Sequence, residues 1–365
     1  MDNFILLNQG AIIIKKRILL IVTLLFILTS CQTNPKEISQ EDLEKKIWNK
    51  ANLNQEVVSE KVKEAVKQYK NQKQDYNFGL EDYESFGTYM NYFDITKYKR
   101  IDNVAIDRWG LPVVQYGDSF HYNPVTLSQF ALSSYSDSLK HREDPSDNDQ
   151  FFVAVDKILS MMDQDGAFRY TFKWYNYNSG EDYPIGWVSS MAQGQVMSVL
   201  SRAYYITKDQ KYLDYANKAM GFLLKPVEDG GVRTDLSDVD PTLKDYIFFE
   251  EYVSKPDSYT LNGYIFTLLG IYDYKEALKL AGNIEAHKKI NEYFDSGIKS
   301  LLKIIDFYDV GGFTNYDLGY INFDVELRLI PSYHAVHIRQ MHALYSITGE
   351  EKFKEKEELW KSYVD

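Results

Sequence analysis

Apolar residues recur at helical spacing along most of the chain beyond residue 54. Pro124 suits the first turn of a helix that we expect to reach about Leu139. Asp147 can cap the next helix, which would end before a turn at Asp165-Gly166. The same spacing predicts further helices near residues 55–69, 187–207, 209–224, 258–280, 285–307, 333–347 and 350–363. The chain is therefore predicted to be mainly α-helical.

The segment from residue 75 to residue 123 has a different pattern. It is rich in Tyr, Phe, Asp and Gly, and short runs such as 113–120 alternate between apolar and polar residues. Alternation with a period of two is typical of strands, so we expect loops and one or two β-hairpins here. The glycine pairs at 230–231 and 311–312 predict further tight turns or short hairpins between helices.

A weak recurrence links two parts of the helical region. Residues 204–212 resemble residues 345–353, since each stretch ends one helix, turns tightly and begins another helix with an acidic residue in its first turn. Repeated helix pairs without a fixed period favour an (α/α) toroid, with a cleft at the end where the loops converge. Unrelated helical hairpins that share turn chemistry are the alternative. The predicted fold is mainly α, an incomplete (α/α) toroid or barrel with short N-terminal β-hairpins.

The N-terminal pattern is typical of an exported protein. Three basic residues at 15–17 precede an apolar run over 18–28, which is short for a stable membrane span. The run ends in Leu28-Thr29-Ser30-Cys31, which resembles a bacterial lipoprotein box in which the cysteine is acylated. We therefore expect lipidation of Cys31 and a location in the cell envelope, in the periplasm or at the outer membrane of a bacterium. An uncleaved anchor helix is the alternative.

These patterns divide the chain into four parts. We expect a lipoprotein signal peptide at 1–30, a polar tether at 31–53, an N-terminal helix and β-hairpin segment at 54–123, and the helical domain at 124–365. Because Cys31 is the only cysteine, neither a disulfide nor cysteine-based catalysis is expected in the mature chain.

Charge and composition narrow the range of ligands. The chain has 41 basic and 53 acidic residues, a net charge of −12, which argues against wholesale binding to nucleic acid or to an anionic membrane surface. Membrane contact is expected through the lipid anchor only. The 30 tyrosines fit a glycan cleft, because phenol rings stack on sugar faces and donate hydrogen bonds. An acidic glycan would require cations concentrated at its binding site.

The sequence lacks the common cofactor and nucleophile motifs, namely G-x-G-x-x-G, the P-loop, H-E-x-x-H, paired C-x-x-C and G-x-S-x-G. No cofactor is therefore expected. Three other stretches are unusual, at residues 186–195, 250–264 and 313–338. The first carries two Gly, two Ser and two Gln where a helix begins, so its backbone must approach another group closely.

These three stretches resemble the C-terminal epimerase domain of the D-glucuronyl C5-epimerases. Versions of that domain read roughly GWYSAMAQGQ, EEYP…VLNG and TxYDL…YHTTHI, in the same order and at similar spacing over about residues 184–364. A fainter match covers residues 109–135. The resemblance implies an isomerase that converts D-glucuronate to L-iduronate residues within a heparosan-like polysaccharide. An acidic polysaccharide is thus the expected partner, and a homodimer is a further expectation.

Inversion at C5 of a uronate requires two groups on opposite faces of the sugar. One group removes the weakly acidic proton α to the carboxylate, and the other delivers a proton from the opposite side. The negative charge that develops must be neutralised by protonation or by cationic contact. By motif match, the family's catalytic residues fall on Glu251, Tyr252, Tyr316 and Tyr333. The resemblance implies that Glu251 and Tyr333 are opposed acid and base. The other two tyrosines would bind or neutralise the carboxylate.

The expected substrate-binding residues are Tyr122, Gln129, Trp187, Gln193, Asn262, Arg328 and His334. One departure concerns carboxylate recognition, because the family has an arginine directly after Tyr-Asp-Leu where this chain has Gly319. Arg328 or Arg169 is the expected replacement. Animal members of the family also insert a β-rich domain between the segments that match Tyr135 and Met161, which here are joined almost directly.

Several of these residues also have a structural interpretation. Taken alone, Glu250 and Glu251 would be a solvated pair at a helix entry, and Tyr333 a buried aromatic residue. His334 and His337 share a helix face at a spacing that metal sites use. A third histidine nearby lies off that face, so structural or substrate contact is favoured over metal binding.

Three other functions are alternatives. A uronate polysaccharide lyase would share the carbanion at C5 but expel the group at C4, which leaves an unsaturated end. A glycoside hydrolase would need two carboxyl groups about 5–10 Å apart. The candidates for that pair are Asp165, Glu181, Asp182 and Glu251. A non-catalytic glycan-binding lipoprotein is the third alternative.

Overall fold

The computed structural model describes residues 37–76, 81–90, 92 and 94–365. The predicted signal peptide and Cys31 lie outside the described residues. The chain forms two units, residues 1–39 and 40–365, and all the described helices and strands belong to the second unit. No helix in the described part is both long and apolar enough to span a membrane.

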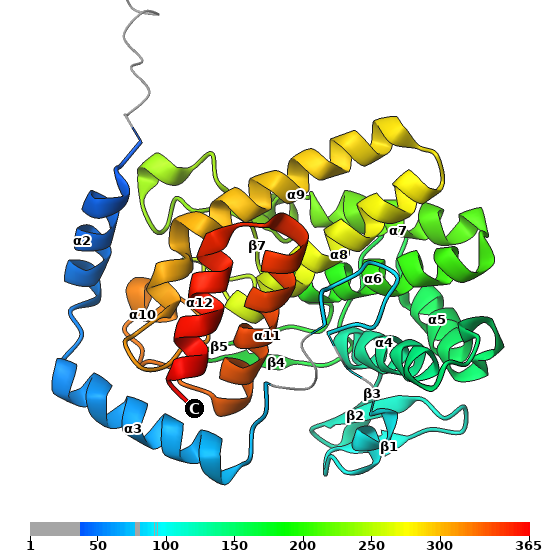
Figure 1. Cartoon of the computed structure of the whole chain (residues 1–365), viewed down its shortest axis with the longest axis horizontal. Coiled ribbons are helices and arrows are strands. Elements are labelled where there is room, and N and C mark those ends of the chain that lie inside the picture. Colours follow the sequence, from blue (N-terminus) through cyan, green and yellow to red (C-terminus); the bar gives the residue numbers. More distant parts are fainter. Residues whose placement is uncertain (1–36, 77–80, 91, 93) are drawn as a thin grey trace, which may run out of the picture. The chain divides into compact units, whose positions relative to one another are not determined.

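Four helix pairs dominate the described part of the chain, which is mainly helical as predicted (Figure 1). They are α4 (Pro124–His141) with α5 (Asp149–Met161), α6 (Ser190–Thr207) with α7 (Gln210–Leu223), α8 (Leu261–Leu280) with α9 (Ile284–Ile304), and α11 (Pro331–Thr348) with α12 (Glu351–Ser362). The first helices of the pairs also pack on one another, α6 on α4 and α8, and α11 on α8. The helices predicted in this region are confirmed, with ends that shift by a few residues.

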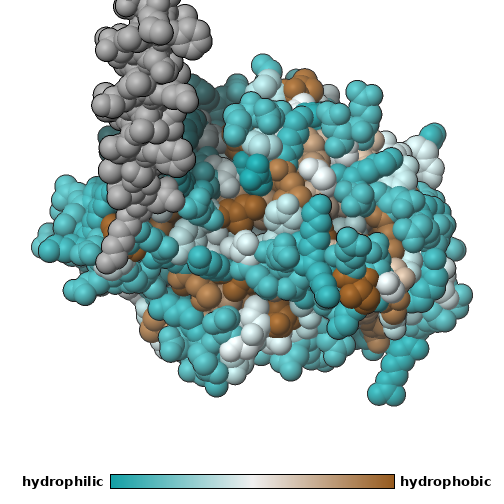
Figure 2. Space-filling view, turned by 90° about the horizontal axis from the view of Figure 1, so that it is seen from above, coloured by the Kyte–Doolittle hydropathy of each residue, from teal (hydrophilic) through white to brown (hydrophobic). Residues whose placement is uncertain are grey.

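Burial separates an inner layer of helices from an outer one. Every residue of α6 from Ser190 to Tyr204 is buried, and α8 is buried along most of its length. The outer helix α9 buries one face, through residues such as Phe294, Ile298 and Leu301. A helix that is buried on all sides lies inside the packing, and amphipathic helices cover it. The surface seen in Figure 2 is correspondingly hydrophilic over most of its area.

Two glycines allow the inner helices α6 and α8 to approach closely. A Cβ atom on Gly270 would lie 2.0 Å from the carbonyl oxygen of Gly194, and one on Gly194 would lie 2.5 Å from the Cα atom of Thr267. Any larger residue would force the two backbones apart, because these separations are far inside van der Waals contact. The close backbone approach predicted for residues 186–195 is thus confirmed at Gly194.

The two recurrent stretches form equivalent turns. The residue after α6 is Lys208 and the residue after α11 is Gly349, and both C-cap residues adopt the left-handed conformation, with φ of 57° and 70°. Each turn leads directly from an inner helix to its outer partner. The recurrence in the sequence therefore marks the same unit of structure, an inner helix followed by an outer one.

Three small antiparallel sheets lie among the described residues. They consist of β1 (Val104–Ile106), β2 (Pro112–Tyr116) and β3 (Ser119–His121), of β4 (Trp174–Asn176) and β5 (Glu181–Tyr183), and of β6 (Arg233–Asp235) and β7 (Ile247–Phe249). In the first sheet Val114 pairs with Val104. The hairpin predicted at 113–120 is confirmed, and the glycine turn at 230–231 leads into β6. The sequence pattern did not predict β4 and β5.

Two helices precede the sheets, α2 (Gln40–Ala51) and α3 (Gln55–Asn71). α3 matches the first predicted helix, whereas α2 lies within the segment predicted to be a tether. The tether prediction does not hold for α2, because Leu43 and Ile47 are buried and Lys46 forms an ion pair with Asp240. The short helical turns are η1 (Ile95–Lys99), η2 (Pro145–Asp147), η3 (Val227–Asp229), η4 (Pro241–Leu243), η5 (Ile305–Tyr308) and α10 (Gly319–Asn322).

A buried ion pair ties the segment before η1 to the inner helices. Arg202 on α6 and Asp273 on α8 are fully buried, and Arg202 Nη1 lies 2.8 Å from Asp273 Oδ2. Tyr83 donates a hydrogen bond to Asp273 at 2.8 Å, and Arg202 donates one to the carbonyl oxygen of Gly87 at 3.3 Å. Buried charges require such pairing and hydrogen bonding. The segment that leads to η1 is therefore anchored to the helical core.

Candidate active site

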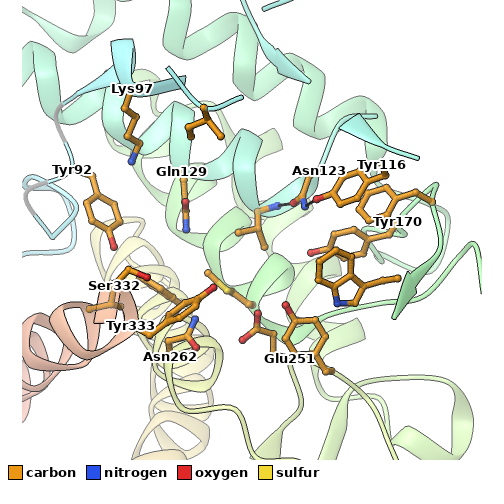
Figure 3. Close-up of a pocket in the computed structure, with 18 of the residues that line it drawn as sticks. Tyr92, Lys97, Tyr116, Asn123, Gln129, Tyr170, Glu251, Asn262, Ser332 and Tyr333 are labelled. Carbon is orange, nitrogen blue, oxygen red and sulfur yellow. Dashed lines mark hydrogen bonds between the residues drawn. The ribbon is translucent and has the colours of Figure 1, made fainter. Parts of the chain in front are cut away.

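A cleft of about 940 Å³ lies at the N-terminal ends of the inner helices α4, α6, α8 and α11. Its lining includes Gln129 from α4, Met191 from α6, Asn262 from α8 and Tyr333 from α11. Figure 3 shows Glu251, Asn262 and Tyr333 near one another in this cleft. Helix N-termini carry partial positive charge, so four of them at one cleft favour an anionic ligand.

The chain just after β7 places two neighbouring carboxyl groups in different surroundings. Glu250 is fully buried, and its two oxygens accept hydrogen bonds from the Tyr259 amide at 2.9 Å and the Ser258 hydroxyl at 3.2 Å. Glu251 lines the cleft, is only 6% exposed, and its Oε2 atom has no hydrogen-bond partner among the described residues. Successive side chains of an extended chain point to opposite sides, which explains the division. Glu250 therefore stabilises the fold, whereas Glu251 is available to a ligand.

The segments that carry the site residues also cap inner helices through their backbone. The carbonyl oxygen of Glu250 accepts a hydrogen bond from the Ser190 amide of α6 at 3.0 Å, and that of Tyr316 accepts one from the Leu261 amide of α8 at 3.1 Å. Neither helix has a side-chain cap. Because the first amides of a helix need acceptors outside it, these bonds fix Glu251 and Tyr316 relative to the inner helices.

Glycine at position 263 leaves the space that the Glu251 side chain occupies. A Cβ atom on Gly263 would lie 2.1 Å from Glu251 Oε2 and 2.7 Å from its Cβ atom. The preceding residue, Asn262, lines the cleft itself. At the start of α8, Asn262 therefore contributes a side chain to the cleft, and Gly263 leaves room for the side chain of Glu251.

Burial changes the protonation of the acidic groups in the cleft. It raises the pKa of Glu251 to about 8, opposed by a hydrogen bond from Tyr252 and by the charge of Arg328. Burial, followed by the charge of Glu251, raises the pKa of Tyr333 to about 12. The same two causes raise the pKa of Tyr252 and of Tyr316 well above the ordinary value. With these pKa values, Glu251 is mostly protonated at neutral pH and the phenols are hydrogen-bond donors.

Tyr316 lies behind Tyr333 and links the cleft to a cation. The two ring centroids are 4.5 Å apart, and Tyr316 is buried. The guanidinium carbon of Arg328 lies 4.5 Å from the Tyr316 ring centroid, and Arg328 pairs with Asp317 at 2.8 Å. Arg328 does not line the cleft but a smaller neighbouring cavity, together with Tyr252. Its charge nevertheless acts on the cleft, since it lowers the pKa of Glu251, Tyr316 and Tyr333.

The Asn178 side chain occupies the space next to Gly319, where the family has an arginine. A Cβ atom on Gly319 would lie 2.6 Å from Asn178 Oδ1. Of the two expected replacements, Arg169 pairs with Asp163 at 2.6 Å and does not line the cleft. Arg328 is the nearer substitute, since its charge lowers the pKa of Glu251 and of Tyr333.

One end of the cleft is an aromatic wall. The wall consists of Tyr116, Tyr170, Phe172, Trp174 and Trp187. Tyr116 stacks on Phe172 with ring centroids 3.4 Å apart, and Tyr170 stacks on Trp187 at 3.7 Å. The rings come from β2, from β4 and from the loops before α6. Aromatic side chains with polar tips combine an apolar face with hydrogen bonding, which suits the faces of sugar rings.

The other end of the cleft is basic. Lys97 from η1 and Arg339 from α11 line it together with Tyr92, and Figure 3 shows Lys97 and Tyr92 on the side away from the aromatic wall. Sequence reasoning missed both cations. Tyr333, Val336 and Arg339 follow at intervals of three along α11 and all line the cleft, so helical spacing was a usable signal for Arg339. Lys97 lies in a segment without a periodic pattern, which offered no signal.

Six of the predicted site residues line the cleft, namely Gln129, Trp187, Glu251, Tyr252, Asn262 and Tyr333. Tyr316 lies directly behind it, and Arg328 lies beside it. The three remaining predicted contacts, Tyr122, Gln193 and His334, do not line the cleft. Tyr122 donates a hydrogen bond to Asp107, and its ring packs under the Lys157 amino group at 3.9 Å.

Gln193 and His334 are structural residues. Gln193 is buried, and its amide nitrogen donates to the carbonyl oxygen of Gly166 at 2.9 Å. His334 is buried between the Thr314 hydroxyl at 2.9 Å and the carbonyl oxygen of Trp360 at 3.1 Å. Both lie in motif blocks, but their polar atoms hold the backbone rather than a ligand. The described residues contain no group of three or more His, Cys, Asp or Glu side chains arranged to hold a metal ion.

Fold and cleft together define a mainly helical protein whose cleft joins one buried carboxyl group, a cluster of phenols and an aromatic wall. Residues 162–362 match the family described as D-glucuronyl C5-epimerase C-terminus, and the chain belongs to this family. The resemblance inferred from the three motif blocks is thereby confirmed.

Individual relatives agree with the family. The chain is 33% identical over 220 residues to the D-glucuronyl C5-epimerase of Caenorhabditis elegans, a match that covers 59% of this chain and 35% of that protein. The chain therefore spans about a third of the length of this relative. It is 26% identical over 295 residues to an uncharacterized protein of Methanocaldococcus jannaschii, covering 74% of this chain and 87% of that one.

Among solved structures, a family 76 glycoside hydrolase from a bovine Bacteroides thetaiotaomicron strain is similar with a TM-score of 0.43 and 12% identity. The match covers 70% of this chain and 50% of the hydrolase chain. A likeness of this degree carries no argument about fold or function.

Proposed function

We propose that this protein inverts C5 of D-glucuronate to L-iduronate residues within a heparosan-like polysaccharide. The observation that carries the proposal is the pair Glu251 and Tyr333, which come from separate elements and face one cleft. Membership of the C5-epimerase C-terminus family and the name of the C. elegans relative support the same reaction. The aromatic wall and the basic end of the cleft suit an acidic glycan chain.

In the proposed reaction, one of these two groups accepts the C5 proton and the other donates a proton to the opposite face. The C5–H bond breaks as the proton passes to the acceptor, and its electron pair is delocalised into the carboxyl group. A new C5–H bond then forms with the proton of the donor. Solvent resets both groups, and their roles exchange when the reaction runs in reverse.

The pKa of Glu251 suits either role. At a pKa of about 8, a minor fraction of the carboxyl groups is ionised at neutral pH. That fraction is a stronger base than an ordinary carboxylate, which helps to remove a weakly acidic proton. The protonated majority is ready to donate when the reaction runs the other way.

The negative charge that develops on the sugar carboxyl group needs fixed donors. Tyr252 lines the cleft beside Glu251, and the Tyr316 phenol lies behind Tyr333 with the Arg328 cation above its ring. We assign these groups, together with the helix N-termini, to stabilising that charge. Gln129, Trp187 and Asn262 are assigned to contacts with the glycan. 

The cleft does not favour the glycoside hydrolase alternative. Glu251 is the only carboxyl group that lines the cleft among the described residues. Asp165, Glu181 and Asp182, the other candidates, are exposed. Hydrolysis with retention or inversion needs two carboxyl groups across one glycosidic bond. A lyase shares the carbanion with an epimerase and is distinguished by its product.

The wider setting of the reaction is also proposed. The alternation of inner and outer helices supports an incomplete (α/α) toroid whose cleft lies at the end where the inner helices begin. The signal peptide, the acylation of Cys31, the location in a bacterial envelope and the homodimer stay predictions from the sequence. An envelope location would expose the cleft to polysaccharides outside the cytoplasm.

Solvent exchange at C5 tests the proposed function. The purified protein is incubated with N-sulfated heparosan in deuterated water, and the uronate protons are followed by NMR. Deuterium at C5 together with new iduronate signals is the expected result. Unsaturated chain ends would indicate the lyase instead, and a folded protein that produces neither with heparosan or other polyuronides would contradict the epimerase proposal.

A further inference from the structure

The basic end of the cleft contains two cations that share one aromatic ring. The Lys97 amino group lies 4.9 Å from the Tyr92 ring centroid, and the guanidinium carbon of Arg339 lies 5.5 Å from the same centroid. Both side chains are half-buried and line the cleft. They approach from different elements, η1 and α11, so the fold brings together residues that are far apart in the sequence.

Neither cation has a carboxylate partner in the described part of the chain. The ion pairs of the described residues involve many other lysines and arginines but not Lys97 or Arg339, although the chain has 53 acidic and only 41 basic residues. Arg339 makes one long hydrogen bond to the carbonyl oxygen of Ala335, at 3.4 Å. Burial, together with the charge of Arg339, lowers the pKa of Lys97 to about 8, opposed by the charge of Asp94, which itself forms an ion pair with Arg100. Two cations held close together without an ion-pair partner repel each other, and a bound anion would relieve the repulsion.

The position of the cations separates them from the reacting sugar. Arg339 follows Tyr333 by six residues on α11, which corresponds to about 9 Å along the helix axis. The carboxyl group of the reacting uronate would lie near Glu251, where Tyr252, Tyr316 and the charge of Arg328 already serve it. This spacing along α11 would allow the two cations to contact a different sugar of the same chain.

We propose that Lys97 and Arg339 form a subsite for a second anionic group of the glycan chain, either a sulfate on the sugar next to the uronate undergoing inversion or the carboxylate of the next uronate along the chain. The glycan would lie along the cleft, with one side on the aromatic wall and its next anionic group between the two cations. This inference rests on the proposed function. It defines the substrate class as a polymer that carries a further anionic group within one or two sugars of the reacting uronate.

Binding measured without turnover tests this subsite. Isothermal titration calorimetry is carried out on the full chain with a heparosan hexasaccharide, which carries only carboxylates, and with its N-sulfated form. The variants are K97Q, R339Q and the double variant. Losing charge-assisted hydrogen bonds to an anion should weaken binding of at least one ligand by about tenfold or more in the double variant. The dependence of binding on salt should also become shallower.

A matched control separates the subsite from the overall charge of the protein. Lys289 on α9 is exposed and does not line the cleft, and K289Q removes one positive charge, as K97Q and R339Q do. It should bind both ligands as the wild type does. R339K keeps the charge, so it should retain most of the affinity, and thermal unfolding of every variant verifies that it is folded.

The outcomes show whether the anion is a sulfate or a carboxylate. They also distinguish a failure of the subsite proposal from a failure of the proposed function. Loss of affinity for the N-sulfated ligand alone identifies the sulfate, and equal loss for both ligands identifies the carboxylate. Unchanged affinity of the folded double variant for both ligands overturns the subsite. C5 exchange in the same variants should show a raised KM with little change in kcat, and a loss of kcat with unchanged binding would also overturn it. Absence of C5 exchange in the wild type contradicts the proposed function while leaving the calorimetric result interpretable.

Discussion

The core side and the cleft side of the chain just after β7 differ in how completely their polar groups are hydrogen-bonded. On the core side, both oxygens of Glu250 accept hydrogen bonds, and the Tyr308 hydroxyl donates to the carbonyl oxygen of Tyr259 at 2.7 Å. On the cleft side, one oxygen of Glu251 has no hydrogen-bond partner among the described residues, although Tyr252 lies beside it. Burial raises the pKa of both carboxyl groups. A buried carboxyl group with a raised pKa therefore does not mark a site by itself, whereas an unpaired oxygen in a cleft does.

Replacing Glu251, the carboxyl group that lines the cleft, should have the largest effect on activity. Glu251→Gln keeps the shape of the side chain but cannot accept or donate the C5 proton, so the rate of C5 exchange should fall by about 10²–10⁴-fold. Tyr333→Phe should cause a loss of similar size in the rate of inversion. Exchange and inversion are measured by NMR, and a folded E251Q variant that exchanges C5 at the wild-type rate would remove Glu251 from the mechanism.

Moving Glu251 without removing it should have the next largest effect. In Gly263→Ala the added methyl group would overlap the Glu251 carboxyl group, which must shift. A displacement of about 1 Å can cost on the order of 10²-fold in rate. The matched control is Gly221→Ala on α7, where an added Cβ atom meets nothing within 4 Å. Equal activity of the two folded variants would show that the site tolerates a displaced carboxyl group.

Replacing Glu250, the buried neighbour of Glu251, should lower the stability of the fold rather than change the chemistry. Glu250→Ala leaves the Tyr259 amide and the Ser258 hydroxyl without an acceptor in a buried site. The free energy of unfolding should fall by about 1–3 kcal/mol. Urea denaturation measures this change, and C5 exchange is normalised to the folded fraction. Loss of exchange with an unchanged unfolding free energy would reverse the roles assigned to the two neighbours.

The smallest expected effect is the contribution of Glu251 to the pH dependence of stability. The folded pKa of Glu251, about 8, lies above its ordinary value of 4.5, so the favourable contribution is complete below pH 4.5 and is lost as pH rises toward 8. Relative to E251Q, the wild type should therefore lose on the order of 1 kcal/mol for each pH unit across this window. Denaturation of both proteins at several pH values measures the difference. A difference that stays constant from pH 5 to pH 8 would mean that the carboxyl group is not held neutral by burial.

The sequence allowed much of the fold to be predicted, because the paired helices carry regular apolar spacing and clear turn residues. α2 was missed because few of its residues are apolar, and the burial of Leu43 and Ile47 depends on the tertiary structure. β4 and β5 were missed for a related reason. Each is three residues long, which is too short for alternation to be recognised.

The site was predicted unevenly. The motif blocks predicted Glu251 and Tyr333, and both line the cleft. The blocks did not separate cleft residues from residues such as Gln193, whose amide donates a hydrogen bond to a backbone carbonyl group. Both kinds of residue are polar, and only burial and bonding partners tell them apart. Lys97 and Arg339 could not be paired from the sequence, because the fold alone joins η1 to α11 across the cleft.

The central claim is that Glu251 and Tyr333 serve opposite faces of one sugar. The most direct measurement supplies Tyr333→Phe with glucuronate-containing and iduronate-containing chains separately in deuterated water and follows both exchange and configuration at C5. We predict that neither substrate is inverted and that only one of them, the epimer whose C5–H bond faces Glu251, exchanges its proton. Inversion at the wild-type rate, or exchange of both epimers, would contradict the claim, because proton transfer on the face opposite Glu251 would then not require Tyr333.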